Sequence, residues 1–122
     1  PRTRANLDKF GIDLGPNVTL VGPQPYMAFL NVWKDAAVVL TDSGGLQEET
    51  TALGVPCITL RENTERPVTI DEGTNILAGT KREDVLAAFD KVMSGGKSGR
   101  VPRFWDGKSA QRIADHLKSV FA

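Results

Sequence analysis

The feature with the clearest chemical meaning is a glycine-rich turn that leads from a predicted strand into a predicted helix. Residues 41–49 read TDSGGLQEE. Glycines let a ligand approach backbone N–H groups without a Cβ in the way, and the N–H groups at a helix start favour phosphate. The Ser43 hydroxyl adds a donor beside Gly44 and Gly45, and Glu49, about one turn on, can accept hydrogen bonds from a ribose diol. The pattern predicts phosphate binding; in the competing interpretation Ser43 only caps its helix and the glycines serve packing.

A second polar loop follows the next predicted strand. Residues 61–67 read RENTERP, with arginines at Arg61 and Arg66, and guanidinium groups pair well with phosphate oxygens. Alternatively this is a surface loop whose arginines and glutamates pair with one another. Because ligands bind beyond the carboxyl ends of parallel strands, we expect this loop to lie beside the glycine turn.

A third loop, residues 22–29 (GPQPYMAF), also follows a predicted strand. The amide of Gln24 can read the edge of a base, and Phe29 can cover a flat ring. From the helical spacing alone, however, Phe29 is interpreted as a core residue.

The sequence offers no evident catalytic or metal centre. His116 is the only histidine and falls on the last predicted helix, so neither a zinc cluster nor a Ser/His/Asp set can be assembled. Asp42 and Glu48 are candidate acids or bases without an evident partner, and Asp42 is interpreted as an anchor for its own loop. We therefore predict a binding edge, with no metal and no cofactor.

Composition limits the class of protein. The 122 residues suit a single domain, and 15 Lys+Arg balance 15 Asp+Glu. A net charge of zero argues against a nucleic-acid partner, and no apolar run approaches the ~20 residues of a membrane helix. Cys57 is the only cysteine, which fits a reducing compartment. The chain begins at Pro1 with a helix already under way, and we expect it to be a piece of a longer protein.

Short apolar runs alternate with helical patterns along the whole chain. This alternation predicts an α/β fold, a parallel sheet with helices on both faces, whose opening strand is missing. Gly54 is expected in a left-handed conformation at a helix end, Thr80 as the cap of the fifth helix, and Ile113, Leu117 and Val120 facing inward from the last helix. Expected helices cover residues 3–10, 26–35, 46–53, 67–72 and 81–93 and a last segment from Ser109; expected strands cover 18–21, 37–41, 57–60 and 75–78.

The three loops together resemble the non-hydrolysing UDP-N-acetylglucosamine 2-epimerases of bacteria. The resemblance covers essentially the whole chain, and the pairing of DSGG with TERP is its most specific part. Val68 departs from the pattern, since many members have Glu there. The matching stretches are residues 22–26 (GPQPY), 40–49 (LTDSGGLQEE), 53–56 (LGVP), 61–67 (RENTERP), 73–77 (GTNIL) and 106–113 (DGKSAQRI).

The resemblance implies a GT-B arrangement of two Rossmann-like domains. Residues 1–122 would be most of the C-terminal, UDP-binding domain, truncated at its N-terminus. The implied UDP contacts are Gln24 and Phe29 to uracil, Ser43, Gly44 and Gly45 to the diphosphate, Glu49 to the ribose, and Arg66 near the phosphates.

The family's reaction, by the same resemblance, interconverts UDP-GlcNAc and UDP-ManNAc. UDP leaves by anti elimination to give 2-acetamidoglucal and then adds again with inversion at C2. The acids credited with proton transfer, and a histidine, belong to parts that this chain lacks, so the fragment alone is expected to be inactive. The parent enzyme is expected to be a cytoplasmic homodimer that serves polysaccharide biosynthesis.

The same loops leave two alternative functions open. The donor-nucleotide domain of a GT-B glycosyltransferase would share the fold, the glycine loop and the carboxylate. A non-catalytic interaction module would bind no nucleotide even beside a complete second domain, and would leave all three loops without a role.

Overall fold

A small parallel sheet forms the centre of the molecule. The computed structural model describes residues 2–121. Strands β1 (Val39–Thr41), β2 (Cys57–Thr59) and β3 (Asn75–Leu77) pair in the order β1-β2-β3, with Leu40 beside Ile58 and Ile58 beside Ile76. Because all three strands are parallel, the loops that follow Thr41, Thr59 and Leu77 leave from the same edge. The predicted α/β fold is confirmed.

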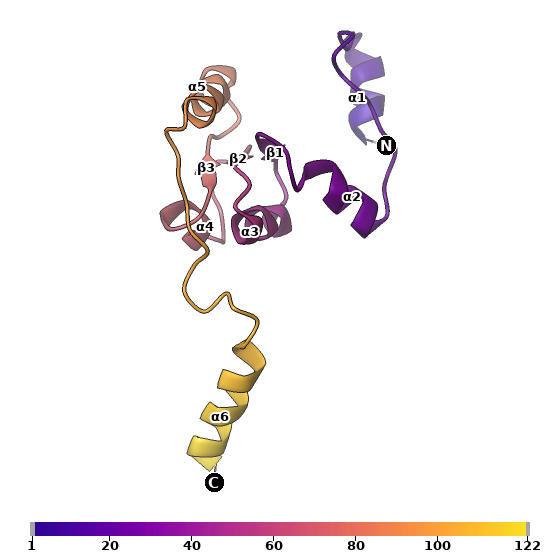
Figure 1. The fold of residues 1–122 in the computed structure, drawn as a ribbon. Coiled ribbons are helices and arrows are strands. Elements are labelled where there is room, and N and C mark those ends of the chain that lie inside the picture. The colour runs from indigo at the N-terminus through magenta and orange to yellow at the C-terminus, as the bar shows by residue number, and fades with distance from the viewer. Residues whose placement is uncertain (1, 122) are drawn as a thin grey trace.

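Helices cover both faces of this sheet. Helix α5 (Arg82–Met93) lies on one face, and α3 (Gly44–Leu53) and α4 (Val68–Asp71) lie on the other (Figure 1). Helix α2 (Tyr26–Trp33) packs beside β1 and α3, and α1 (Arg2–Phe10) stands farther out. Helix α6 (Ser109–Phe121) extends away from the sheet. None of the helices within residues 2–121 is long and apolar enough to cross a membrane.

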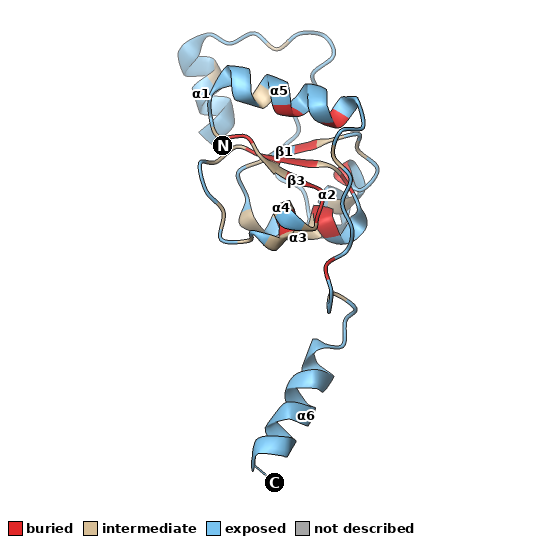
Figure 2. Cartoon of the chain, turned by 90° about the vertical axis from the view of Figure 1, so that its left-hand side faces the viewer, coloured by how far each residue is buried: buried red, intermediate tan, exposed pale blue. Residues whose placement is uncertain are grey.

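Two apolar clusters fix the sheet between its helices, where the buried residues gather (Figure 2). On the α5 side, Ile58 packs with Ala78, Ala88 and Val92. The other cluster, formed by Trp33, Val39 and Val55, joins α2 and α3 to β1. Neighbouring residues of a strand point to opposite faces, so Val38 packs against the first cluster while Val39 belongs to the second.

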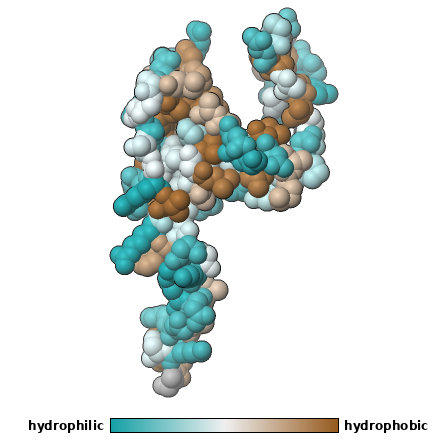
Figure 3. All heavy atoms as spheres, viewed as in Figure 1, coloured by the Kyte–Doolittle hydropathy of each residue, from teal (hydrophilic) through white to brown (hydrophobic). Residues whose placement is uncertain are grey.

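The expected strand at residues 18–21 is wrong for this chain. The segment has no strand pairing, and Val18 and Val21 are 54% and 58% exposed. An extended segment without a hydrogen-bonded neighbour leaves its backbone groups to water, so the apolar run alone does not make a strand. Hydrophobic residues are likewise exposed over the part of the molecule that holds α1 and α2 (Figure 3).

Two further expectations about the helices fail. The side chain of Thr80 does not cap α5; its Oγ1 donates to Glu62 Oε1 at 3.2 Å instead. The residues expected to face inward from α6, Ile113, Leu117 and Val120, are all exposed, because no other element of residues 2–121 covers this helix. The left-handed Gly54 at the end of α3 is confirmed, with φ of 73°.

Candidate functional site

The glycines of the candidate phosphate site lie inside the first turn of α3, two residues earlier than the sequence predicts. The loop before it is short: the Ser43 N–H donates to Thr41 Oγ1 at 3.0 Å. The Ser43 side chain makes no capping hydrogen bond, although Ser43 precedes the helix. The capping interpretation therefore does not explain this hydroxyl, which is exposed at the end of the helix where the N–H groups lack partners.

Close approach, and not a sharp turn, explains why glycine stands at position 44. Neither Gly44 nor Gly45 has a positive φ. A Cβ on Gly44 would lie 2.8 Å from Nη1 of Arg66 and 2.8 Å from Oε1 of Glu65, whereas a Cβ on Gly45 would meet nothing within 4 Å. Gly44 thus allows the Arg66 guanidinium to lie against the first turn of α3, and the two loops meet as predicted.

Arg66 is paired with two carboxylates. Its Nε lies 2.8 Å from Oε2 of Glu48, an ion-pair distance whose angle does not make a hydrogen bond, and its Nη1 donates to Oε1 of Glu65 at 2.6 Å. Interaction with Glu48 above all raises the pKa of Arg66, which therefore stays charged. Glu48, which has no evident partner in the sequence, is paired with Arg66 in the structure, so an arriving phosphate must compete with both carboxylates for the guanidinium.

A backbone hydrogen bond and two nearby arginines lower the pKa of Glu65. Its own backbone N–H lowers the pKa of Glu65, and the nearby Arg61 and Arg66 lower it further. Arg61 Nη1 donates to Glu65 Oε2 at 3.2 Å. The arginines and glutamates of this loop thus pair with one another, as the alternative interpretation predicts. This pairing does not involve the Ser43 hydroxyl or the N–H groups at the start of α3.

Glu49 carries a buried carboxylate oxygen that has no hydrogen-bond partner among residues 2–121. Such atoms are costly and call for an explanation, and a hydroxyl donor from a ligand would supply one. The anchoring role expected of Asp42 is not seen: within the described residues its carboxylate makes no hydrogen bond, and Thr41 holds the turn instead.

A buried polar network lies behind the site. Gln47 Oε1 accepts hydrogen bonds from Thr64 Oγ1 at 2.6 Å and Asn75 Nδ2 at 3.2 Å, and Gln47 Nε2 donates to the Ser43 carbonyl at 3.3 Å. Asn75 is tied to Thr59, whose Oγ1 donates to Asn75 Oδ1 at 2.7 Å. Sequence reasoning missed these residues, although an Asn at the start of a short, otherwise apolar strand was an available signal.

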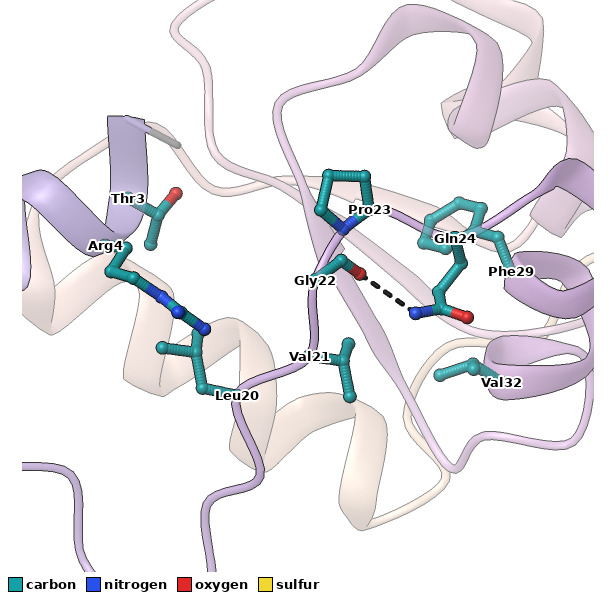
Figure 4. A pocket seen from close by; sticks show the side chains of 9 residues that line it. All are labelled: Thr3, Arg4, Leu20, Val21, Gly22, Pro23, Gln24, Phe29 and Val32. Carbon is teal, nitrogen blue, oxygen red and sulfur yellow. Dashed lines mark hydrogen bonds between the residues drawn. The ribbon is translucent and has the colours of Figure 1, made fainter.

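Gln24 and Phe29 line a separate open cavity of about 650 Å³ (Figure 4). Gln24 Nε2 donates to the Gly22 carbonyl at 3.1 Å. Phe29 is 40% exposed, so its interpretation as a core residue is wrong. The cavity is lined by Thr3, Arg4, Leu20, Val21, Gly22, Pro23, Gln24, Phe29 and Val32. No residue of 41–49 or 61–67 belongs to this lining, so the structure unites two of the three predicted loops and leaves the third in its own cavity.

Among residues 2–121, no group of three or more His, Cys, Asp and Glu side chains could hold a metal ion. The site brings together the Ser43 hydroxyl, the N–H groups at the start of α3 and the Arg66 guanidinium. Such an arrangement suits an anion with several oxygen acceptors, such as a phosphate or diphosphate.

Comparison with known proteins gives a consistent result. Residues 1–118 match the family model described as UDP-N-acetylglucosamine 2-epimerase. A UDP-N-acetylglucosamine 2-epimerase of Methanococcus maripaludis is 44% identical over 119 residues, which cover 94% of this chain and 32% of the relative. One of Methanocaldococcus jannaschii is 41% identical over 117 residues, covering 93% of this chain and 32% of the relative.

Solved structures agree. The UDP-GlcNAc 2-epimerase of Methanocaldococcus jannaschii superposes with a TM-score of 0.80 at 40% identity, covering 98% of this chain and 34% of that one. A structure of that enzyme in complex with UDP-GlcNAc and UDP gives a TM-score of 0.79 at 40% identity and the same coverage. The chain thus spans about a third of the length of these relatives.

Proposed function

Because the chain belongs to the UDP-N-acetylglucosamine 2-epimerase family, we propose that it is the UDP-binding part of an enzyme that interconverts UDP-GlcNAc and UDP-ManNAc. In this proposal residues 1–122 form the nucleotide-binding, C-terminal Rossmann-like domain of a two-domain GT-B enzyme. A solved relative at 40% identity holds UDP-GlcNAc and UDP, which supports this nucleotide as the ligand. The glycosyltransferase alternative lacks comparable support, since the relatives compared above are named as epimerases.

The observation that carries the proposal is the position of Arg66 against the first turn of α3, in the space that Gly44 leaves open. The Ser43 hydroxyl and the N–H groups of Gly44 and Gly45 face the diphosphate in this proposal, and Arg66 exchanges one of its carboxylate partners for a phosphate oxygen. The helix backbone holds the N–H groups of Gly44 and Gly45 in place before the ligand arrives, so they stabilise negative charge as it develops on the departing UDP.

The other contacts extend along the nucleotide. The unpartnered carboxylate oxygen of Glu49 accepts hydrogen bonds from the ribose hydroxyls. Gln24 and Phe29, in their open cavity, hold the uracil. Proton transfer at C2 is the task of residues outside this chain, and we expect the whole enzyme to be a homodimer that acts in the cytoplasm.

Calorimetry with UDP tests the phosphate site through the variant Ser43→Ala. A hydrogen bond to a charged group contributes about 1.5–3 kcal/mol. Since 1.4 kcal/mol is tenfold in affinity, we expect UDP to bind roughly 10- to 100-fold more weakly. Ser98→Ala, an exposed serine on the loop after α5, is the matched control and should bind as the unaltered chain does. Equal affinity in Ser43→Ala and Ser98→Ala would remove Ser43 from the site.

The reaction itself is tested with the full-length enzyme and UDP-GlcNAc alone. Epimerisation needs no acceptor sugar, so UDP-ManNAc should appear in the absence of any other substrate. Sugar transfer that depends on an added acceptor would instead favour the glycosyltransferase.

A further inference from the structure

Gln47 is completely buried, and both polar ends of its side-chain amide have hydrogen-bond partners. The residue is 0% exposed in the second turn of α3. Its carbonyl oxygen accepts from Thr64 and Asn75, and its amide nitrogen donates to the Ser43 carbonyl. A backbone carbonyl can only accept, so the contact with Ser43 fixes which end of the amide faces which loop.

These hydrogen bonds join the two loops of the candidate phosphate site. On one side, the amide nitrogen of Gln47 holds the carbonyl of Ser43, whose hydroxyl is a proposed phosphate donor. On the other side, Thr64 Oγ1 donates to Gln47 at 2.6 Å and accepts from the Arg66 N–H at 3.1 Å. One side chain therefore connects the backbone of Ser43 with the backbone of Arg66 through a single hydroxyl.

The connection is also fixed to the sheet. Asn75, the first residue of β3, donates from Nδ2 to Gln47 and to Thr69 Oγ1 at 3.1 Å, and accepts from Thr59 of β2. Each of these side chains is 0% exposed. A buried amide that loses a partner bears the cost of its desolvation, so the network favours one arrangement of the loops over others.

We infer that Gln47 is a positioning residue that sets the Ser43 turn and the Arg66 loop at the separation a diphosphate requires. The inference rests on the proposed function and deepens it. A site already arranged in the free protein avoids the entropic cost of ordering two loops on binding. Gln47 does not touch the nucleotide in this account; it acts through Ser43 and through Thr64.

The test compares UDP with uridine on two variants of the full chain. Gln47→Met keeps the length of the side chain and removes both polar ends, and Thr64→Val keeps the shape of the threonine and removes its hydroxyl. We expect each to weaken UDP about tenfold, the order of one lost hydrogen bond. Uridine, measured by ligand-observed NMR, should bind unchanged, because no residue of this network lines the cavity of Gln24 and Phe29.

Two controls separate positioning from general stability. Thr64→Ser retains the hydroxyl and should restore UDP binding. The double variant Gln47→Met/Thr64→Val should bind UDP only slightly more weakly than whichever single variant binds it more weakly, because both changes break the same connection. Thermal unfolding of each variant reports the folded fraction, and Thr64→Val provides the result if Gln47→Met does not fold.

Each outcome decides the matter. Equal losses for UDP and uridine would reduce Gln47 to a structural residue and overturn the inference. Unchanged UDP binding in both variants, with the unaltered chain binding UDP, would overturn it while leaving the proposed function intact. Failure of the unaltered chain to bind UDP would overturn the proposed function and the inference with it.

Discussion

Replacement of Gly44 by alanine separates the stability of the fold from binding of the nucleotide. Gly44 is the first residue of α3 and has no positive φ, so alanine fits its backbone. The added Cβ would lie 2.8 Å from Arg66 Nη1 and 2.8 Å from Glu65 Oε1. Both atoms are at the ends of flexible side chains, so the side chains move and the helix stays in place.

The two expected effects have opposite signs. Alanine is favoured over glycine in a helix by up to about 1 kcal/mol, so the free energy of unfolding should stay level or rise slightly. Displacement of Arg66 removes a hydrogen bond to phosphate, and such bonds to charged groups contribute about 1.5–3 kcal/mol. Since 1.4 kcal/mol corresponds to a tenfold change in affinity, Gly44→Ala should bind UDP at least tenfold more weakly than the unaltered chain, although it is at least as stable.

Chemical denaturation and UDP calorimetry measure these two quantities on the same preparations. Gly15→Ala is the matched control, because a Cβ there meets nothing within 4 Å and the residue lies in neither loop of the phosphate site. We expect unchanged UDP affinity in Gly15→Ala. Wild-type affinity in a folded Gly44→Ala chain would refute the placement of Arg66 at the phosphates.

Two other substitutions test the ribose contact and an ion pair far from the site. Glu49→Gln keeps the shape of the side chain but removes its charge. UDP should bind to this variant about tenfold more weakly by calorimetry, because charge-assisted hydrogen bonds are roughly twice as strong as neutral ones. A 2′,3′-dideoxy analogue of UDP, which lacks the ribose hydroxyls, should bind equally well to Glu49→Gln and to the unaltered chain. The Asp106 carboxylate accepts two hydrogen bonds from Arg112, from Nη1 to Oδ1 at 2.7 Å and from Nη2 to Oδ2 at 2.5 Å. This interaction above all holds the pKa of Asp106 well below its ordinary 3.8. A carboxylate whose pKa is lowered by folding stabilises the fold at pH values above its ordinary pKa. Asp106→Asn should therefore lower the melting temperature at neutral pH, and the difference in melting temperature from the unaltered chain should narrow as the pH falls below 3.8. A difference in melting temperature that stays constant from pH 7 to pH 3 would contradict a stabilising role of the Asp106–Arg112 pair.

The sequence predicted the parts of the fold that depend on local pattern. Short apolar runs around Val39, Ile58 and Ile76 became the three parallel strands, and Gly54 ended α3 as expected. Residues 18–21 have an equally apolar pattern but no strand to pair with, and pairing is a property of the partner as much as of the segment. The same reasoning applies to α6, whose apolar residues have no surface within the described chain to pack against.

The site was predictable where chemistry followed from residue type and position in the topology. The juxtaposition of the glycine turn with Arg66 followed from parallel strands that end at one edge. The reason for Gly44 did not, because a close contact with a side chain 22 positions away leaves no mark on local sequence. The role of Gln47 was hidden for the same reason: its partners Thr64 and Asn75 lie 17 and 28 residues away in sequence.

Backbone amide shifts during a UDP titration, followed by NMR, test the central claim most directly. If the start of α3 holds the diphosphate, the largest changes fall on the N–H groups of Ser43, Gly44 and Gly45, and the Arg66 side chain shifts with them. Uridine without phosphates should leave these signals in place. Changes confined to the region of Gln24 and Phe29, with residues 43–45 silent at saturating UDP, would show that the phosphates bind elsewhere.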